Sequence, residues 1–315
     1  MALPARADRL DDDLTSLWES LWDQRGEPQR LMRWEEPLRF RVGGPQGAKH
    51  RAAIAAAVAK AAEAAQLAVS EVTLPPPGSN AKDTTNLAML VYDDDDLDDN
   101  TPCDAQLQHI DMSLSYARVR MRSSQVWDCV HHELMHAMGI PGHPSGKTVL
   151  SYFPWRQDKL LDLDRLLLAV WYDRALPSGA TPFEILWNGG QQVVKQSASD
   201  MPLQQAEQRR RAHFAARLRD MEDFALGRGD APMIVKRSGR ASPGHIEDAR
   251  QWMAYYVGLA HKNATGVAAD PVEAHRWLAS AARAGKQTPA PRELEQLEKT
   301  MDSALLAKAR AQGPR

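Results

Sequence analysis

The chain of 315 residues lacks the features of several protein classes. No window approaches about 18 consecutive apolar residues, so we expect no transmembrane helix. The chain also lacks a large excess of one charge, since its formal net charge is −2. It therefore has no general electrostatic attraction to nucleic acid or to acidic membranes. Its two cysteines, Cys103 and Cys129, do not stand at zinc-finger spacing. The first residues lack the basic and apolar regions of a signal peptide, and we expect a chain from which a leader has been removed.

The most informative stretch that is present is 131–139, which contains a His-Glu-x-x-His pattern. Residues four apart lie on one face of a helix, so His132 and His136 can direct their imidazole nitrogens at one metal ion. Glu133 then points beside that ion and can take a proton from a metal-bound water. An exposed helix rich in His and Glu would give the same pattern with no metal.

The surroundings of the pattern favour the metal site. Gly139 stands where the end of a helix needs a residue of positive φ, and Pro141 prevents any continuation of the helix. His131 lies about 100° around the helix from His132, which predicts a surface or supporting role instead of ligation. The apolar residues of the segment predict a buried helix, and they are Val126, Trp127, Val130, Leu134, Ala137 and Met138.

A third imidazole follows the helix, because His143 comes four residues after Gly139. Three histidines with one open position make a three-ligand zinc site. Together with the short segment 148–152, which ends in Tyr152, these residues resemble the metzincin metallopeptidases, most closely the serralysin-type branch. In that branch the pattern His-Glu-x-x-His-x-x-Gly-x-x-His precedes a tight turn beneath the metal.

The resemblance implies a zinc endopeptidase. His132, His136 and His143 would hold Zn²⁺, while Glu133 would deprotonate the zinc-bound water and later protonate the leaving amine. Tyr152 would assist the oxyanion, unless it is a core tyrosine.

The chain departs from the family pattern in two places. Gly142 stands where the family has its third histidine, and Leu150 stands in place of the methionine of the turn. The resemblance covers about residues 31–185, and it extends to bacterial metzincin-like domains that carry a cysteine just before the active helix.

The predicted fold class is α+β: a metzincin-like small twisted mixed sheet with helices, including the zinc-binding helix, followed by an all-α helical-repeat segment. Alternation of apolar and basic residues in 38–42 is typical of a half-buried strand. Similar reasoning predicts strands at 69–74, 86–92 and 111–121, and helices at 49–68 and 160–172.

Length and composition favour two domains, with 43% hydrophobic residues to build their cores. We predict a helical, acidic N-terminal extension at 1–30, acting as a propeptide or a docking element, and a metallopeptidase domain at 31–185. A linker at 186–202 and a helical domain at 203–315 follow. The first helix of that domain, 203–226, has the pattern of an amphipathic helix with a solvated basic face.

The segment near 250–286 resembles a Sel-one-like repeat, a short relative of tetratricopeptide repeats built of paired helices. Small residues such as Gly258 and Ala281 allow the two helices to approach closely, and Trp277 and Leu278 fill the space between them. Because such units need neighbours to bury their faces, we expect this one to pack on the catalytic domain or to bind a partner protein.

Two further groups of residues leave alternatives open. The acidic run 93–96 could hold Ca²⁺, although a solvated loop gives the same pattern. Cys103 and Cys129 are either free buried thiols or a disulfide between a loop and the active helix, and we favour the disulfide. It implies an oxidising compartment, so we expect the protein to be periplasmic or secreted.

We therefore predict a zinc-dependent metallopeptidase that cleaves a protein or peptide substrate, with no nucleic acid partner. Two alternatives remain: a catalytically weak metal-binding domain, and an envelope adaptor that acts through its helical repeat. The sequence does not identify a substrate.

Overall fold

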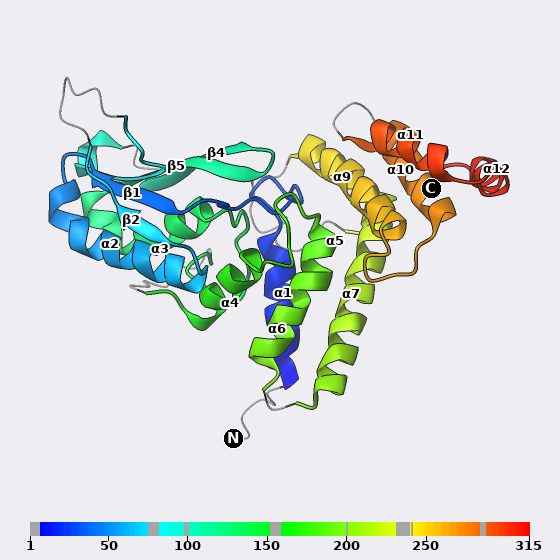
Figure 1. Cartoon of the computed structure of the whole chain (residues 1–315), viewed down its shortest axis with the longest axis horizontal. Helices are drawn as coiled ribbons and strands as arrows, with labels where there is room; N and C mark the ends of the chain where they lie inside the picture. The colour runs from blue at the N-terminus through cyan, green and yellow to red at the C-terminus, as the bar shows by residue number, and fades with distance from the viewer. Residues whose placement is uncertain are drawn as a thin grey trace. The chain divides into compact units, whose positions relative to one another are not determined.

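A computed structural model describes residues 7–74, 82–97, 101–151, 159–199, 201–230, 240, 242–283 and 288–315 (Figure 1). The chain divides into two compact units. One is Arg30–Gly179, and the other joins Met1–Gln29 to Ala180–Arg315. Among the described helices, none has the length and apolar character needed to cross a membrane.

The first unit, Arg30–Gly179, is built on a five-stranded mixed sheet with the order β2-β1-β3-β5-β4, which confirms the predicted α+β class. The pairs β1–β2, β1–β3 and β3–β5 are parallel, while β4 runs antiparallel to β5 at the edge. The strands are β1 (Leu38–Gly43), β2 (Val69–Glu71), β3 (Leu87–Tyr92), β4 (Cys103–Ile110) and β5 (Ser113–Arg122).

Strand β4 was not predicted, because its residues are mostly polar and partly or fully exposed, as an edge strand tolerates. The strand predicted at 111–121 is β5, which begins two residues later than predicted, at Ser113. Asp111 and Met112 have φ values of 48° and 66° and form the turn between β4 and β5.

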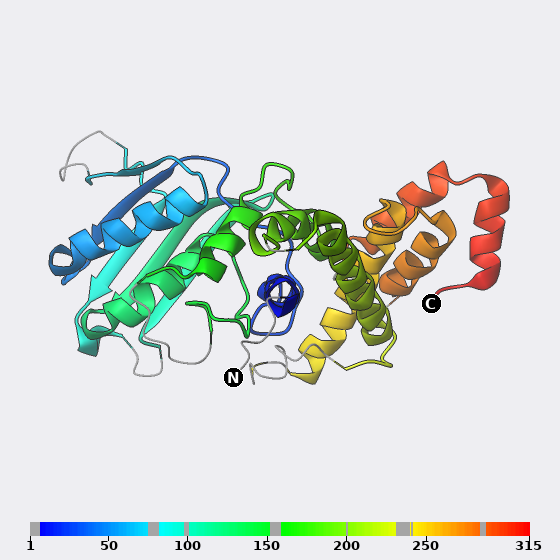
Figure 2. The same cartoon turned by 90° about the horizontal axis from the view of Figure 1, so that it is seen from below.

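Two helices cover one face of the sheet, α2 (Gly47–Ala64) and α3 (Val126–Ala137), and both run along the same side of it in Figures 1 and 2. The residues of β5 alternate accordingly. Val119 and Met121 are fully buried, whereas Arg118, Arg120 and Arg122 on the opposite face are half-buried. The apolar side of the sheet and the two helices thus form the core of this unit.

A disulfide joins the sheet to α3, as predicted. Cys103, the first residue of β4, is bonded to Cys129 with a Cα–Cα distance of 6.1 Å. Helix α4 (Asp162–Trp171) completes the unit, and its buried residues include Leu166, Leu167 and Val170.

The described elements of the second unit are helices. They are α1 (Ala7–Ser20), α5 (Pro182–Glu184), a π-helical turn (Ile185–Gly189), α6 (Gly190–Ser197), α7 (Leu203–Ala225), α9 (Pro243–Lys262), α10 (Pro271–Arg283), α11 (Ala290–Thr300) and α12 (Ser303–Gln312). Helix α1 is grouped with these helices, although it precedes the sheet unit in sequence. Trp18 of α1 stacks on Phe183 with ring centroids 5.8 Å apart.

The prediction of an irregular linker at 186–202 is wrong, because most of that segment is helical. Val193 and Val194 are buried, so this stretch contributes to the core of the unit. Of the two glycines read as a linker signal, Gly190 packs closely, since a Cβ there would lie 3.3 Å from the Arg210 side chain.

Helix α7 also differs in one respect from its prediction. Phe214, Leu218 and Met221 are buried as expected, but Arg210 on the predicted basic face is only 2% exposed. Its guanidinium lies 4.2 Å from the ring centroid of Trp187 and donates a 2.7 Å hydrogen bond to the Trp187 carbonyl.

Helices α9 and α10 form the close pair that was expected near 250–286. A Cβ on Gly258 would lie 2.9 Å from Cγ of Leu278, so only glycine allows this approach without a shift. Trp277 and Leu278 are buried, as predicted.

Candidate metal centre

Helix α3 places the two histidines of the motif and then ends sharply. His132 and His136 are one turn apart on α3. Gly139 has φ of 95° and donates its N–H to the His136 carbonyl at 2.8 Å, which ends the helix as predicted. A Cβ at this position would overlap the carbonyl oxygen of Met32.

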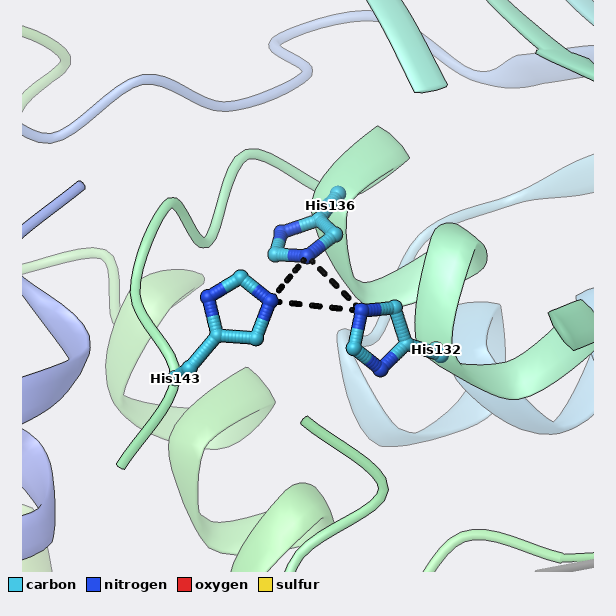
Figure 3. Close-up of side chains that lie close together, drawn as sticks. All are labelled: His132, His136 and His143. Atoms are coloured by element: carbon cyan, nitrogen blue, oxygen red, sulfur yellow. Dashed lines mark hydrogen bonds between the residues drawn. The ribbon is translucent and has the colours of Figure 1, made fainter. Parts of the chain in front are cut away.

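Three imidazole nitrogens, two from α3 and one from the segment after it, converge beside the helix (Figure 3). The Nε2 atom of His136 lies 3.2 Å from Nε2 of His132 and 3.2 Å from Nε2 of His143, and the third side of the triangle is 3.3 Å. In a tetrahedral zinc site with bonds of 2.0–2.1 Å, ligand nitrogens lie about 3.3–3.4 Å apart. The triangle therefore has dimensions that fit three ligands of one metal ion such as zinc, and His143 forms its third corner despite the one-residue shift.

The hydrogen bonds of two of these rings fix their tautomers. His132 donates from Nδ1 to the Val149 carbonyl at 2.9 Å, and His136 donates from Nδ1 to the Ile140 carbonyl at 2.7 Å. A neutral ring whose Nδ1 carries the proton has a lone pair on Nε2. Two lone pairs therefore face each other across 3.2 Å, an arrangement that a cation between them stabilises.

Burial keeps these rings in the neutral form that binds metals. Burial lowers the pKa of His136 to about 3, and the neighbouring His132 adds to the effect. Burial also lowers the pKa of His132, although its bond to Val149 opposes the shift. Within the described residues, these two and His143 are the one group of His, Cys, Asp or Glu side chains able to share a metal ion.

Glu133 follows the first histidine on α3 and is 7% exposed. Burial raises the pKa of its carboxyl to about 8, and the negative charge of Asp104 on β4 contributes. The group can therefore hold or release a proton near neutral pH, as an acid–base residue must.

A tight turn lies behind His132. The N–H of Ser151 donates to the Thr148 carbonyl at 3.2 Å, and Leu150, the residue in the position of the family methionine, is fully buried. Asp164 of α4 accepts hydrogen bonds from the Thr148 hydroxyl and from the Val149 N–H.

The end of α3 is also held by residues that the sequence did not mark as functional. Trp34 donates from its indole nitrogen to the Ala137 carbonyl at 2.9 Å, and the Tyr172 hydroxyl donates to the Met138 carbonyl at 3.0 Å. Asp164, Trp34 and Tyr172 lie outside the His-Glu-x-x-His motif. The sequence placed Asp164 and Tyr172 on the predicted helix 160–172, in a pattern that resembles the helix after the turn in serralysin-type enzymes, but it gave none of the three a role.

Three other sequence predictions have different outcomes. Tyr152 lies outside the described residues. His131 is 6% exposed and does not belong to the cluster, so the surface alternative predicted for it is wrong and the supporting role stays a prediction. The described residues of the acidic run form no group of three carboxylates close enough to share an ion. Asp94 accepts the Ser124 N–H, and Asp93 accepts from the Gln46 amide.

Comparison of the chain with protein-family models, with curated proteins and with solved structures gives no match in any of the three. The metzincin and Sel-one-like resemblances therefore rest on the residues quoted for them. The geometry of the three histidines carries the functional interpretation.

Proposed function

We propose that this protein is a zinc-dependent metallohydrolase that cleaves peptide bonds. The observation that carries the proposal is the triangle of three Nε2 atoms, with sides of 3.2, 3.2 and 3.3 Å. Three neutral imidazoles suit zinc and leave a fourth tetrahedral position for water or substrate. A zinc ion held there would supply a Lewis acid that polarises a carbonyl and acidifies water.

The chain itself supplies the proton transfer. An Oε atom of ionised Glu133 accepts a proton from the attacking water and then donates it to the nitrogen of the leaving amine. Burial and the charge of Asp104 raise the pKa of Glu133 to about 8. The positive charge of a zinc ion held by the neighbouring histidines would lower this pKa again, which favours the ionised form that the first step needs. Its position directly after His132 on α3 is the one that the His-Glu-x-x-His pattern gives to the acid–base carboxyl.

An extended peptide is the substrate form that the sheet favours. Among the described strands, β4 stands last in the order and pairs with β5 alone, so an extended segment can add to it by backbone hydrogen bonds. The charge of Asp104, on this same strand, reaches Glu133, which places the edge near the acid–base group. A peptide bound along β4 would therefore pass close to the reacting atoms.

The Cys103–Cys129 disulfide supports a periplasmic or extracellular location, because disulfides persist in oxidising compartments. We include this location in the proposal.

The test combines metal content with hydrolysis. Glu133→Gln should retain near-stoichiometric zinc by mass spectrometry but lose at least about 100-fold in cleavage of a mixed peptide library. Glu63→Gln, which changes an exposed carboxylate of α2, serves as the matched control and should match the wild type.

Two results would contradict the proposal in different ways. Absence of zinc after reconstitution of the wild type would exclude the metal centre. Zinc without any cleavage, together with partner binding that depends on α9–α12, would favour an adaptor with a catalytically weak metal domain.

A further inference from the structure

Asp164 is a buried carboxylate outside the histidine cluster. Its exposed fraction is 0%, and an ionised group at such a site is costly unless several hydrogen bonds compensate. It accepts from the Thr148 hydroxyl, from the Val149 N–H at 3.1 and 3.3 Å and from the Leu161 N–H at 2.8 Å. Two of these three donors belong to the turn behind His132.

Val149 connects this carboxylate to the cluster. Its N–H donates to Asp164, while its carbonyl accepts the Nδ1–H of His132 at 2.9 Å. The hydroxyl of Thr148 fixes the same turn from a second side, because it also accepts the Leu150 N–H at 3.1 Å. The N–H and the carbonyl of Val149 are joined through the same Cα. The hydrogen bond from this N–H to Asp164 therefore fixes the direction in which the carbonyl points, and no charge transfer is involved.

His136 has no such dependence on a distant element among the described contacts. Its Nδ1 donates to the carbonyl of Ile140, four residues along, and the Ile140 N–H is held by the Met135 carbonyl at 3.2 Å. The end of α3 therefore orients His136 locally, whereas His132 depends on the turn that Asp164 holds.

We propose that Asp164 is a positioning residue of the metal centre: through Thr148 and Val149 it fixes the ring orientation and tautomer of His132. The inference rests on the proposed function, because it concerns the same three-histidine site. Loss of the carboxylate lets the turn move. The Nε2 lone pair of His132 then no longer points at the position that the Nε2 atoms of His136 and His143 also face.

The experiment uses the full chain with Asp164→Asn and Thr148→Val. In Asp164→Asn, the NH₂ group of the amide faces at least one of the three hydrogen-bond donors that the carboxylate accepts from. In Thr148→Val, the hydroxyl is lost while the side-chain volume stays nearly constant. Asn86→Ala is the matched control. That side chain is also buried: its oxygen accepts the N–H of Arg39 in β1, and its NH₂ group donates to the Pro37 carbonyl. Neither bond involves the cluster or the turn.

Two readouts report on the site without activity. The first is zinc affinity by competition with a chromophoric chelator, and the second is the visible absorption spectrum of the cobalt-substituted protein, which reports ligand geometry. We expect about 10–100-fold weaker zinc binding and an altered cobalt spectrum for Asp164→Asn and Thr148→Val. Thr148→Ser, which keeps the hydroxyl, should restore both readouts, and Asn86→Ala should leave both unchanged even if its thermal midpoint falls.

The outcomes separate this inference from the proposed function. Wild-type affinity and spectrum in Thr148→Val would overturn the positioning role alone, as would equal weakening in Asn86→Ala. If Asp164→Asn does not fold, the Thr148→Val and Thr148→Ser pair still decides. A wild-type protein that binds no zinc would overturn both proposals.

Discussion

Gly139 is the residue on which the end of α3 depends. Its φ of 95° is unfavourable for any residue with a Cβ, and a Cβ there would also overlap the Met32 carbonyl oxygen. We expect Gly139→Ala to lower the free energy of unfolding by about 2–4 kcal/mol in urea titrations at neutral pH. Zinc affinity should fall with it, because His136 and His143 lie on either side of the turn.

The matched control for this substitution is Gly47→Ala. Gly47 begins α2, and the nearest atoms to an added Cβ belong to Val42 at 3.7 Å, an ordinary contact. Alanine should be neutral there or stabilise the helix by up to about 1 kcal/mol. Equal behaviour of the two variants would show that the positive φ and the Met32 contact carry no energetic weight.

At the level of single residues, the sequence predicted the part of the site that one helix contains. The spacing of His132, Glu133 and His136 is a local property, so the motif was sufficient to place them on one face. His143 was expected from its chemistry, against the family spacing. Asp164 was not assigned any role, because its contact with the turn depends on how α4 packs and leaves no local signal.

Among the secondary-structure elements, those with a clear apolar pattern were predicted, whereas one edge strand and the helical stretch 182–197 were missed. Helix α3 has an apolar side and a glycine stop, both readable in the chain. β4 has neither an apolar run nor a clear alternation, because an edge strand buries little, and hydrogen bonding to β5 decides its structure. The π-helical turn and α6 were missed because Gly189 and Gly190 were read as linker residues, whereas close packing explains Gly190.

Helix α7 carries an acid-sensitive group. Burial lowers the pKa of His213 to about 4, and Arg217 one turn along contributes to the shift. Above pH 6.5 the imidazole of His213 is neutral in both the folded and the unfolded chain, so it does not change the free energy of unfolding there. As the pH falls from 6.5 towards 4 the unfolded chain takes up the proton first, so stability is lost in that window.

The expected magnitude is about 2–3 kcal/mol at pH 4.5 relative to pH 7. His213→Gln should remove this part of the acid destabilisation, measured by urea unfolding followed by circular dichroism at both pH values. His109→Gln, which removes an exposed histidine from β4, is the control and should keep the wild-type dependence. An unchanged pH dependence in His213→Gln would contradict the assignment.

For the whole molecule, the order of segments along the chain differs from their grouping in space. Sequence boundaries predicted an N-terminal extension, a catalytic domain, a linker and a helical domain in succession. The structure groups Met1–Gln29 with Ala180–Arg315 and leaves Arg30–Gly179 as its own unit. Linear composition cannot show this, because contacts of α1 with α6 and α7 join segments far apart in the sequence.

This grouping predicts what removal of the N-terminal segment would do. Leu10, Leu14 and Leu17 of α1 are fully buried, and Trp18 is 2% exposed. At roughly 1.5–3 kcal/mol for each buried side chain, their loss exceeds what the helical unit can tolerate. A chain lacking residues 1–29 should therefore lose cooperative unfolding of its helices by circular dichroism, while the unit Arg30–Gly179 still binds zinc in chelator competition.

A propeptide would behave in the opposite way. Its removal would leave the helical unit stable and increase peptide cleavage, because the segment would then cover the site instead of completing a core. The matched control is Asp12→Asn, which changes an exposed residue of α1 and should leave unfolding unaltered. Because the four apolar side chains of α1 are buried within the helical unit, we expect destabilisation without activation.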